Sequence, residues 1–229
     1  MSFPEACAAV CAPGTPFEIV EAEVRGRPTK VFAGTPSNLR ELYAMAATRT
    51  DDFIVYEDER WSMPSVLDLV AQIGHALVHD LGVQHGDRVA IAMRNHPEWI
   101  AAFAAITSVG AIAVPMNAWW QTDEMVFALE DSGSRVVFVD DDRLARLGAD
   151  PGSVTARCVL VRSRTTTDTG LDVVRLDDLL TADASLPDVH IDPDDGPVPD
   201  LVPLLEDALG VQVIVARVAG ARGDDRSRR

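Results

Sequence analysis

Residues 81–140 decide the fold, and they read LGVQHGDRVAIAMRNHPEWIAAFAAITSVGAIAVPMNAWWQTDEMVFALEDSGSRVVFVD. Three short runs in this stretch are apolar and rich in β-branched residues. They are Arg88–Met93, Ala111–Pro115 and Arg135–Asp140. Polar residues bound each run, so the pattern predicts three buried strands.

The segments between these runs have helical spacing. Pro97 suits the first turn of a helix, where its missing N–H is no loss, and Gly110 suits the end. Thr122 is predicted to cap a second helix that carries Asp123 and Glu124 in its first turn. Strands this apolar need cover on both faces, which predicts an α/β fold with a mainly parallel sheet flanked by helices.

Three motifs in this stretch resemble a known family. They are G-D-R-V-A-I-x-M-x-N-x-P-E-W, G-A-I-A-V-P-M-N and E-x-x-x-x-L-x-D-S. They resemble the N-terminal region of the adenylate-forming ligases (the AMP-dependent synthetase/ligase superfamily), and within it the fatty-acyl-CoA synthetase branch. The resemblance extends loosely over residues 38–195 and implies the N-terminal subdomain of that fold, in truncated form. These motifs are typical of the fold, and none of them supplies a catalytic residue.

Composition restricts the classes of function. The 229 residues have a formal net charge of −16, which argues against a nucleic-acid surface. Lys30 is the only lysine, so lysine chemistry is excluded elsewhere in the sequence. The cysteines Cys7, Cys11 and Cys158 lack the further ligands that a metal site needs, and their odd number favours free thiols.

A cytoplasmic location is expected. The N-terminus has no basic region followed by an apolar run, so no secretory signal is predicted. The uncharged stretch Trp99–Thr122 is long enough to raise the question of a membrane span. Thr107, Ser108, Gly110 and Pro115 interrupt it, and a buried helix followed by a buried strand explains it better.

The remaining segments suggest a division into four parts. Ser37 is expected to cap a helix that ends near Thr50, and a hairpin is expected at 53–57 and 60–63. A long helix should begin at Pro64 and stop before Gly82. The expected parts are an irregular N-terminal arm (1–36), the α/β subdomain (37–182), an acidic linker (183–200) and a divergent tail (201–229) with a helix at 201–209 and a strand at 211–218.

No catalytic, cofactor-binding or metal-binding residue is predicted. His75 and His79 have the i,i+4 spacing of metal ligands, but without a third ligand a solvated helix face is the preferred interpretation. Asn117, Trp119 and Trp120 follow a predicted strand, where open parallel sheets bind ligands. They are weak candidates for a substrate or interface contact, and packing of the loop on the core is preferred.

The resemblance also implies chemistry that this sequence does not contain. In the family, which uses ATP, Mg²⁺ and CoA, the loop T-S-G-T-T-G-x-P-K-G follows the acidic segment and binds phosphates. Here Gly196-Pro197-Val198-Pro199 stands at that place, and no lysine follows. The later adenine, ribose and C-terminal-domain motifs have no counterpart in residues 196–229.

Two hypotheses follow. In the first, the chain is the N-terminal part of an AMP-forming acyl-CoA ligase and is inactive alone. In the second, it is a non-catalytic binding or interaction module that retains part of the fold. Under either hypothesis, self-association or a partner chain at the edge of the sheet is an expectation.

Overall fold

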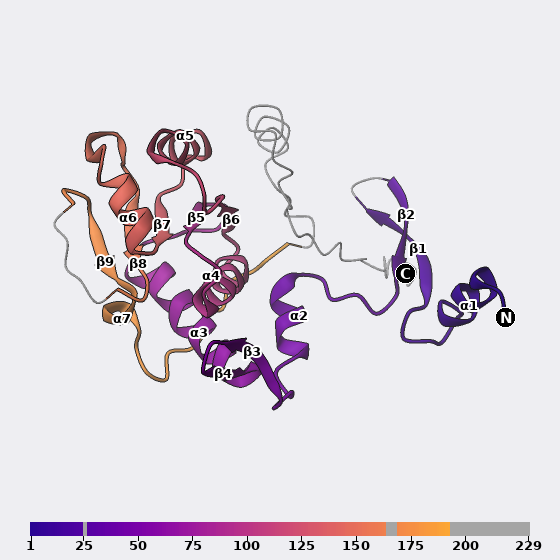
Figure 1. Ribbon diagram of the computed structural model, residues 1–229. Coiled ribbons are helices and arrows are strands. Elements are labelled where there is room, and N and C mark those ends of the chain that lie inside the picture. The colour runs from indigo at the N-terminus through magenta and orange to yellow at the C-terminus, as the bar shows by residue number, and fades with distance from the viewer. Residues whose placement is uncertain (25–26, 164–168, 193–229) are drawn as a thin grey trace, which may run out of the picture. The chain divides into compact units, whose positions relative to one another are not determined.

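The computed structural model describes residues 1–24, 27–163 and 169–192 of the chain (Figure 1). The described residues divide into two compact units, Met1–Leu42 with residues 191–192, and Tyr43–His190. Residues 193–200 of the predicted acidic linker (183–200) lie outside the described residues. The helix predicted at 201–209 and the strand predicted at 211–218 lie entirely outside them.

The first unit contains regular structure that the sequence did not lead us to expect. Helix α1 (Phe3–Val10) is followed by an antiparallel pair, β1 (Ile19–Val24) and β2 (Arg27–Phe32). The prediction of an irregular arm over 1–36 was therefore wrong. Its prolines are compatible with these elements, because Pro4 lies in the first turn of α1 and Pro28 lies in a two-stranded ribbon.

Helix α2 (Leu39–Met45) confirms the predicted helix but corrects its start and end. The side chain of Asn38, rather than Ser37, caps it, since Asn38 Oδ1 accepts a hydrogen bond from the Glu41 backbone N–H at 3.0 Å. The helix also stops before Thr50.

The second unit begins with a hairpin and a long helix. The strands of the hairpin are β3 (Asp52–Tyr56) and β4 (Glu59–Ser62), and helix α3 (Met63–His79) follows directly. Ser62 caps α3 by accepting from the Ser65 N–H, and Gly82 has the positive φ (64°) expected just past a helix end.

A five-stranded parallel sheet forms the centre of this unit and confirms the predicted fold class. Its strand order is β6-β5-β7-β8-β9, and every neighbouring pair is parallel. The strands are β5 (Arg88–Ala92), β6 (Ile112–Pro115), β7 (Val136–Val139), β8 (Arg157–Leu160) and β9 (Val173–Arg175). Strand β9 was not predicted, because three residues are too short for a recognisable pattern.

Helices cover both faces of the sheet (Figure 1). One core cluster joins α3 and α4 (Pro97–Ser108) to the sheet through residues such as Ile91 and Phe138. The second joins the opposite face, at Ala90 and Val137, to α5 (Thr122–Ser132) and α6 (Asp141–Leu147). A 3₁₀ turn at Pro151–Ser153 and the short helix α7 (Leu176–Leu179) complete the described elements.

The structure shows what the uncharged stretch Trp99–Thr122, considered above as a possible membrane span, forms instead. Residues 97–108 form α4 and residues 112–115 form β6, which confirms the predicted helix and strand. The prediction that the strand is buried was wrong, because β6 lies at the edge of the sheet and its residues are partly buried or exposed. Within the described ranges, no helix has both the length and the apolar character to span a bilayer.

Candidate functional site at the carboxyl edge of the sheet

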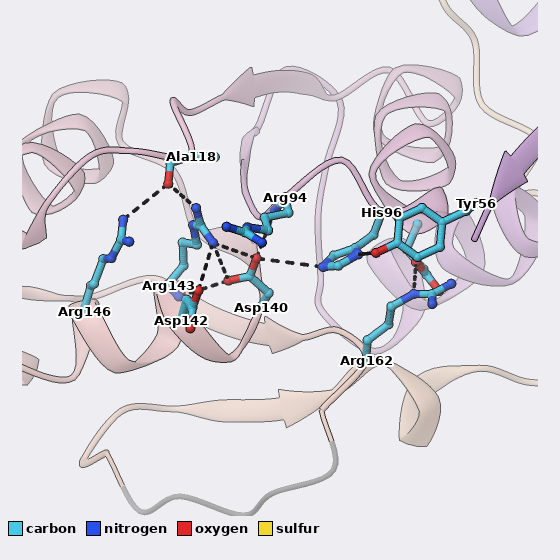
Figure 2. Close-up of polar contacts among 10 residues, drawn as sticks. Tyr56, Arg94, His96, Ala118, Asp140, Asp142, Arg143, Arg146 and Arg162 are labelled. Atoms are coloured by element: carbon cyan, nitrogen blue, oxygen red, sulfur yellow. Dashed lines mark hydrogen bonds and ion pairs between the residues drawn. The ribbon is translucent and has the colours of Figure 1, made fainter. Parts of the chain in front are cut away.

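The sheet has a topological switch point between β5 and β7. These two strands are neighbours, but the loop after β5 leads into α4 on one face and the loop after β7 leads into α6 on the other. Open α/β sheets bind ligands beyond the carboxyl ends of the strands at such a point. Polar side chains gather at this edge, and Figure 2 shows how they lie.

Asp140 is the centre of the first group of polar contacts. It follows β7, is 7% exposed and caps α6 by accepting from the Arg143 backbone N–H at 3.0 Å. Its Oδ2 also accepts from the Arg94 backbone N–H at 2.9 Å and from Arg143 Nη1 at 3.1 Å. The Nε2 of His96 lies 4.0 Å from the same oxygen (Figure 2). One carboxylate therefore joins the loops after β5 and β7.

Two arginines of α6 fix the loop after β6. Arg143 is buried, and its Nη2 donates to the carbonyl oxygen of Ala118. Arg146 Nη1 donates to the same carbonyl at 3.3 Å and to the Trp120 carbonyl at 2.7 Å. The backbone at 118–120 is therefore held in one shape by side chains from another element (Figure 2).

The three residues singled out from the sequence lie in this loop but have different environments. Asn117 Oδ1 accepts from the Trp119 backbone N–H at 2.9 Å, which shapes the turn. Trp120 packs against the core cluster of α5 and α6. The Trp119 side chain is 75% exposed. The preferred interpretation, packing on the core, is therefore correct for Trp120 and wrong for Trp119.

The start of α5 corrects one sequence prediction. Gln121, rather than Thr122, is the N-cap residue, and the Glu124 carboxylate accepts from the Gln121 backbone N–H at 2.8 Å. Thr122 instead uses its hydroxyl to donate to the Arg146 carbonyl at 2.9 Å, which ties α5 to α6.

Arg162 is the centre of the second group, at the end of β8. Its Nη1 and Nη2 donate to the Glu59 carboxylate at 2.6 and 2.8 Å, and its Nε donates to Glu98 at 2.6 Å. These ion pairs tie the β3–β4 hairpin and the start of α4 to the sheet. The hydrogen bonds from Arg162 lower the pKa of the Glu59 carboxyl to about 2.

Tyr56 connects the two groups. The Arg162 guanidinium lies 5.1 Å from the centre of the Tyr56 ring, within the range of a cation–π contact. The Tyr56 hydroxyl lies 3.2 Å from His96 Nδ1. The contacts therefore run from Arg162 through Tyr56, His96 and Asp140 to the loop at Ala118 (Figure 2).

The other candidates do not form a site. The rings of His75 and His79 lie with their centres 4.3 Å apart, but in the described ranges no three His, Cys, Asp or Glu side chains are grouped to hold a metal ion. The three cysteines are free, and burial raises the pKa of the Cys158 thiol to about 12, which makes it a poor nucleophile.

Sequence reasoning missed the charged residues of this edge. Arg94, Asp140 and Arg162 each come directly after an apolar run. Because the strands are parallel, their ends must meet at one edge. That signal was present in the sequence and could have placed the three residues together, although not their partners Glu59 and Arg143.

Comparisons with known proteins agree with the fold. The model of the family described as "AMP-binding enzyme" matches residues 43–198. Long-chain-fatty-acid–CoA ligase FadD13 of Mycobacterium tuberculosis is 38% identical over 81 residues, which are 33% of this chain and 16% of the relative. Ligase FadD15 of Mycobacterium bovis is 33% identical over 135 residues, which are 56% of this chain and 22% of the relative. The chain thus spans about a fifth of the length of these relatives.

Solved structures show the same arrangement. A long-chain-fatty-acid CoA ligase from Rhodopseudomonas palustris superposes with a TM-score of 0.57 and 24% identity, covering 68% of this chain and 39% of that one. A fatty acyl CoA synthetase from Mycobacterium tuberculosis gives a TM-score of 0.55 and 25% identity, covering 67% and 30%. The chain belongs to the AMP-binding enzyme family, and it carries the α/β fold found in the N-terminal domain of the adenylate-forming ligases.

Proposed function

We propose that this chain supplies the N-terminal sheet subdomain of an AMP-forming fatty-acyl-CoA synthetase. In that reaction a fatty acid and ATP form an acyl-adenylate, and the acyl group then passes to CoA. The observation that carries the proposal is the family match over residues 43–198, which includes all five strands of the parallel sheet. The similarity to long-chain-fatty-acid–CoA ligases supports the fatty acid as substrate and a place in fatty acid metabolism.

We also propose that the 229 residues alone do not form an adenylate. Adenylation moves negative charge onto pyrophosphate, and a catalyst must meet that charge with oriented donors and cations. The family's phosphate loop has no counterpart in this sequence, and Lys30, its one lysine, lies outside the matched residues.

The carboxylates of the candidate site do not fit a resident Mg²⁺. Asp140 is paired with Arg143, and both Glu59 and Glu98 are paired with Arg162. A hard cation needs free carboxylate oxygens. The Mg²⁺ of the family is therefore not assigned to this edge.

Exchange of radiolabelled pyrophosphate into ATP, with fatty acid and magnesium present, tests the absence of activity because it reports adenylation without CoA. We expect no exchange above the no-protein control. Exchange that persists in the purified chain and disappears in the core variant Ile91→Ala would refute this part of the proposal.

A chimera tests the structural role separately. Residues 43–192 would replace the corresponding segment of the FadD13 ligase, and the hybrid should recover pyrophosphate exchange. A folded but inactive hybrid would count against the subdomain assignment. Translation of the DNA after codon 195 in the other two frames gives independent information, since a T-S-G-T-T-G-x-P-K-G string there supports an interrupted ligase.

One observation favours the second candidate function, a non-catalytic interaction module. Trp119 is 75% exposed on a loop whose backbone is held by Arg143 and Arg146, and a preorganised exposed aromatic is a common interface contact. The edge strands β6 and β9 are where self-association or a partner strand would add. Light scattering across a concentration series tests this: a strict monomer excludes self-association.

We also propose a cytoplasmic location, which the free thiols support.

A further inference from the structure

A cavity lies at the amino edge of the parallel sheet, the edge opposite to the candidate site described above. Its volume is about 360 Å³, which is at the low end of the range for pockets that hold small molecules. Its lining residues come from the amino ends of β7, β8 and β9, from the end of α5 and from the segment after α3. The adenylation chemistry of the family does not involve this edge, so the cavity needs its own explanation.

Four charged residues line the cavity, two of each sign, namely Glu130, Arg135, Arg157 and Asp172. Arg157 Nε donates to Asp172 Oδ2 at 2.8 Å, and Arg135 Nη1 donates to Asp87 Oδ2 at 3.1 Å. The other side-chain N–H groups of the two arginines have no partner among the described residues. Glu130 makes no ion pair with these residues either. Donors and a carboxylate therefore remain available to a ligand at one place.

Part of the lining is apolar. Leu129 and Val136 are buried, and Leu81 is partly buried against the core. A ligand with a hydrocarbon part would gain free energy by covering these side chains. The cavity thus combines an apolar surface with charges of both signs.

The charges decide which class of ligand fits. A simple anion would be attracted by Arg135 and Arg157 but repelled by Glu130, and the net charge of −16 gives it no long-range attraction. A simple cation would meet the two arginines. A zwitterion matches both signs, because each of its ends can lie against the opposite charge.

Helix α5 indicates where the positive end of such a ligand would lie. Glu130 is in the last turn of this helix, which ends at the left-handed Gly133 (φ 62°). The carboxyl end of a helix carries a partial negative charge, so it adds to the attraction of the Glu130 carboxylate for a cation.

We propose that this cavity binds a free amino acid with an aliphatic side chain. Its carboxylate is held by the available N–H groups of Arg135 and Arg157, and its ammonium group by Glu130 at the end of α5. Its side chain covers Leu81 and Leu129. The site is separate from the proposed function, and neither depends on the other.

Titration of the full chain with L-leucine, followed by ¹H–¹⁵N NMR at constant pH and ionic strength, measures binding directly. We expect saturable shifts of the backbone amide signals of Gly133, Ser134 and Thr155, which line the cavity. Leucinamide lacks the carboxylate and 4-methylpentanoate lacks the ammonium group, so each should bind at least about fivefold more weakly, the effect of losing one partly exposed ion pair. Glycine, which lacks the side chain, should also bind more weakly.

Variants of the two charged contacts test the assignment. Arg157→Gln and Glu130→Gln should each weaken leucine binding about fivefold. Glu130→Gln breaks no ion pair of the described residues, so it keeps the test valid if Arg157→Gln impairs folding.

Each variant has a matched control that should bind leucine like the unmodified chain. Asp131→Asn removes the neighbouring exposed carboxylate of α5, which does not line the cavity. Arg49→Gln removes an exposed arginine paired with Asp51 at 2.9 Å away from the sheet. The proposal would be overturned by an absence of saturable shifts, by 4-methylpentanoate or leucinamide binding as tightly as leucine, or by equal weakening in variants and controls.

Discussion

Arg143 Nη1 lies 3.1 Å from Asp140 Oδ2, and both side chains are almost fully shielded from water, at 3% and 10% exposed. The pair is local, since the two residues are three apart at the start of α6. It nevertheless has long-range consequences. Asp140 binds the loop after β5, and Arg143 binds the loop after β6.

Breaking this pair should destabilise the whole unit. Asp140→Asn leaves the Arg143 guanidinium buried without its counter-charge, which costs about 3–5 kcal/mol in comparable buried pairs. Urea unfolding followed by circular dichroism measures the loss. Asp142→Asn is the control, because Asp142 is 68% exposed and should contribute under about 1 kcal/mol. Equal losses in the two variants would contradict a special role for Asp140.

The centre of the sheet should be sensitive to lost volume. Ile91 is 0% exposed in the middle of β5, so Ile91→Ala should lower the free energy of unfolding by about 2–5 kcal/mol. Val55, in the β3–β4 hairpin, is 60% exposed, and Val55→Ala should cost under about 0.5 kcal/mol. Thermal melting of both variants tests the burial pattern, which would be wrong if the two midpoints moved equally.

The ion pair between Glu59 and Arg162 predicts a pH dependence. The folded pKa of Glu59, about 2, lies below its ordinary value of 4.5, so its contribution is fully present above pH 4.5 and is lost as the pH falls through about 2. Solvent screens a carboxylate that is 39% exposed, so we expect about 1 kcal/mol or less. Glu59→Gln should therefore be less stable than the unmodified chain at pH 7, and the difference should disappear near pH 2.

Glu130→Gln is the control for this pH dependence. Glu130 is exposed on α5 and makes no ion pair with the described residues, so its replacement should leave the stability profile unchanged. A Glu59→Gln profile parallel to that of the unmodified chain across the whole pH range would show that the pair does not titrate as described.

The two neighbouring tryptophans should behave differently. Trp119→Ala removes a side chain that is 75% exposed, and the stability should change by under about 0.5 kcal/mol. Trp120→Ala removes a ring packed on the core of α5 and α6, and should cost at least about 1 kcal/mol. Chemical unfolding of each variant checks this, and a reversed order of the two effects would contradict the placement of the loop.

Periodicity predicted the parallel sheet because Arg88–Met93 and Arg135–Asp140 are apolar on both faces, and such strands must be covered twice. Periodicity could not predict β9, because three residues are too few to show a pattern. These residues become a strand only through their pairing with β8 in the folded chain. The first residues were misjudged for a related reason. Pro4 and Pro28 were taken as signs of irregular backbone, yet each lies where a missing N–H is tolerated.

The site was only partly predictable. Trp119 and Trp120 were identified from their place after a strand, but their different exposure depends on Arg143 and Arg146, which are more than twenty residues away in the sequence. Pairings such as Arg162 with Glu59 span 103 residues. No local pattern encodes them, because they arise only when the ends of several strands have met.

The strand order has a consequence for the nascent chain. Strand β5 is an interior strand, which on one side pairs with β6, the next strand along the chain, and on the other with β7, which is made only after α5. While the ribosome adds residues 116–135, one edge of β5 therefore has unpaired backbone N–H and C=O groups. Non-local parallel pairing of this kind is slow and prone to aggregation. A polypeptide released before Val139 should be captured by chaperones, whereas release after Leu160 leaves β5 and β7 enclosed on both sides.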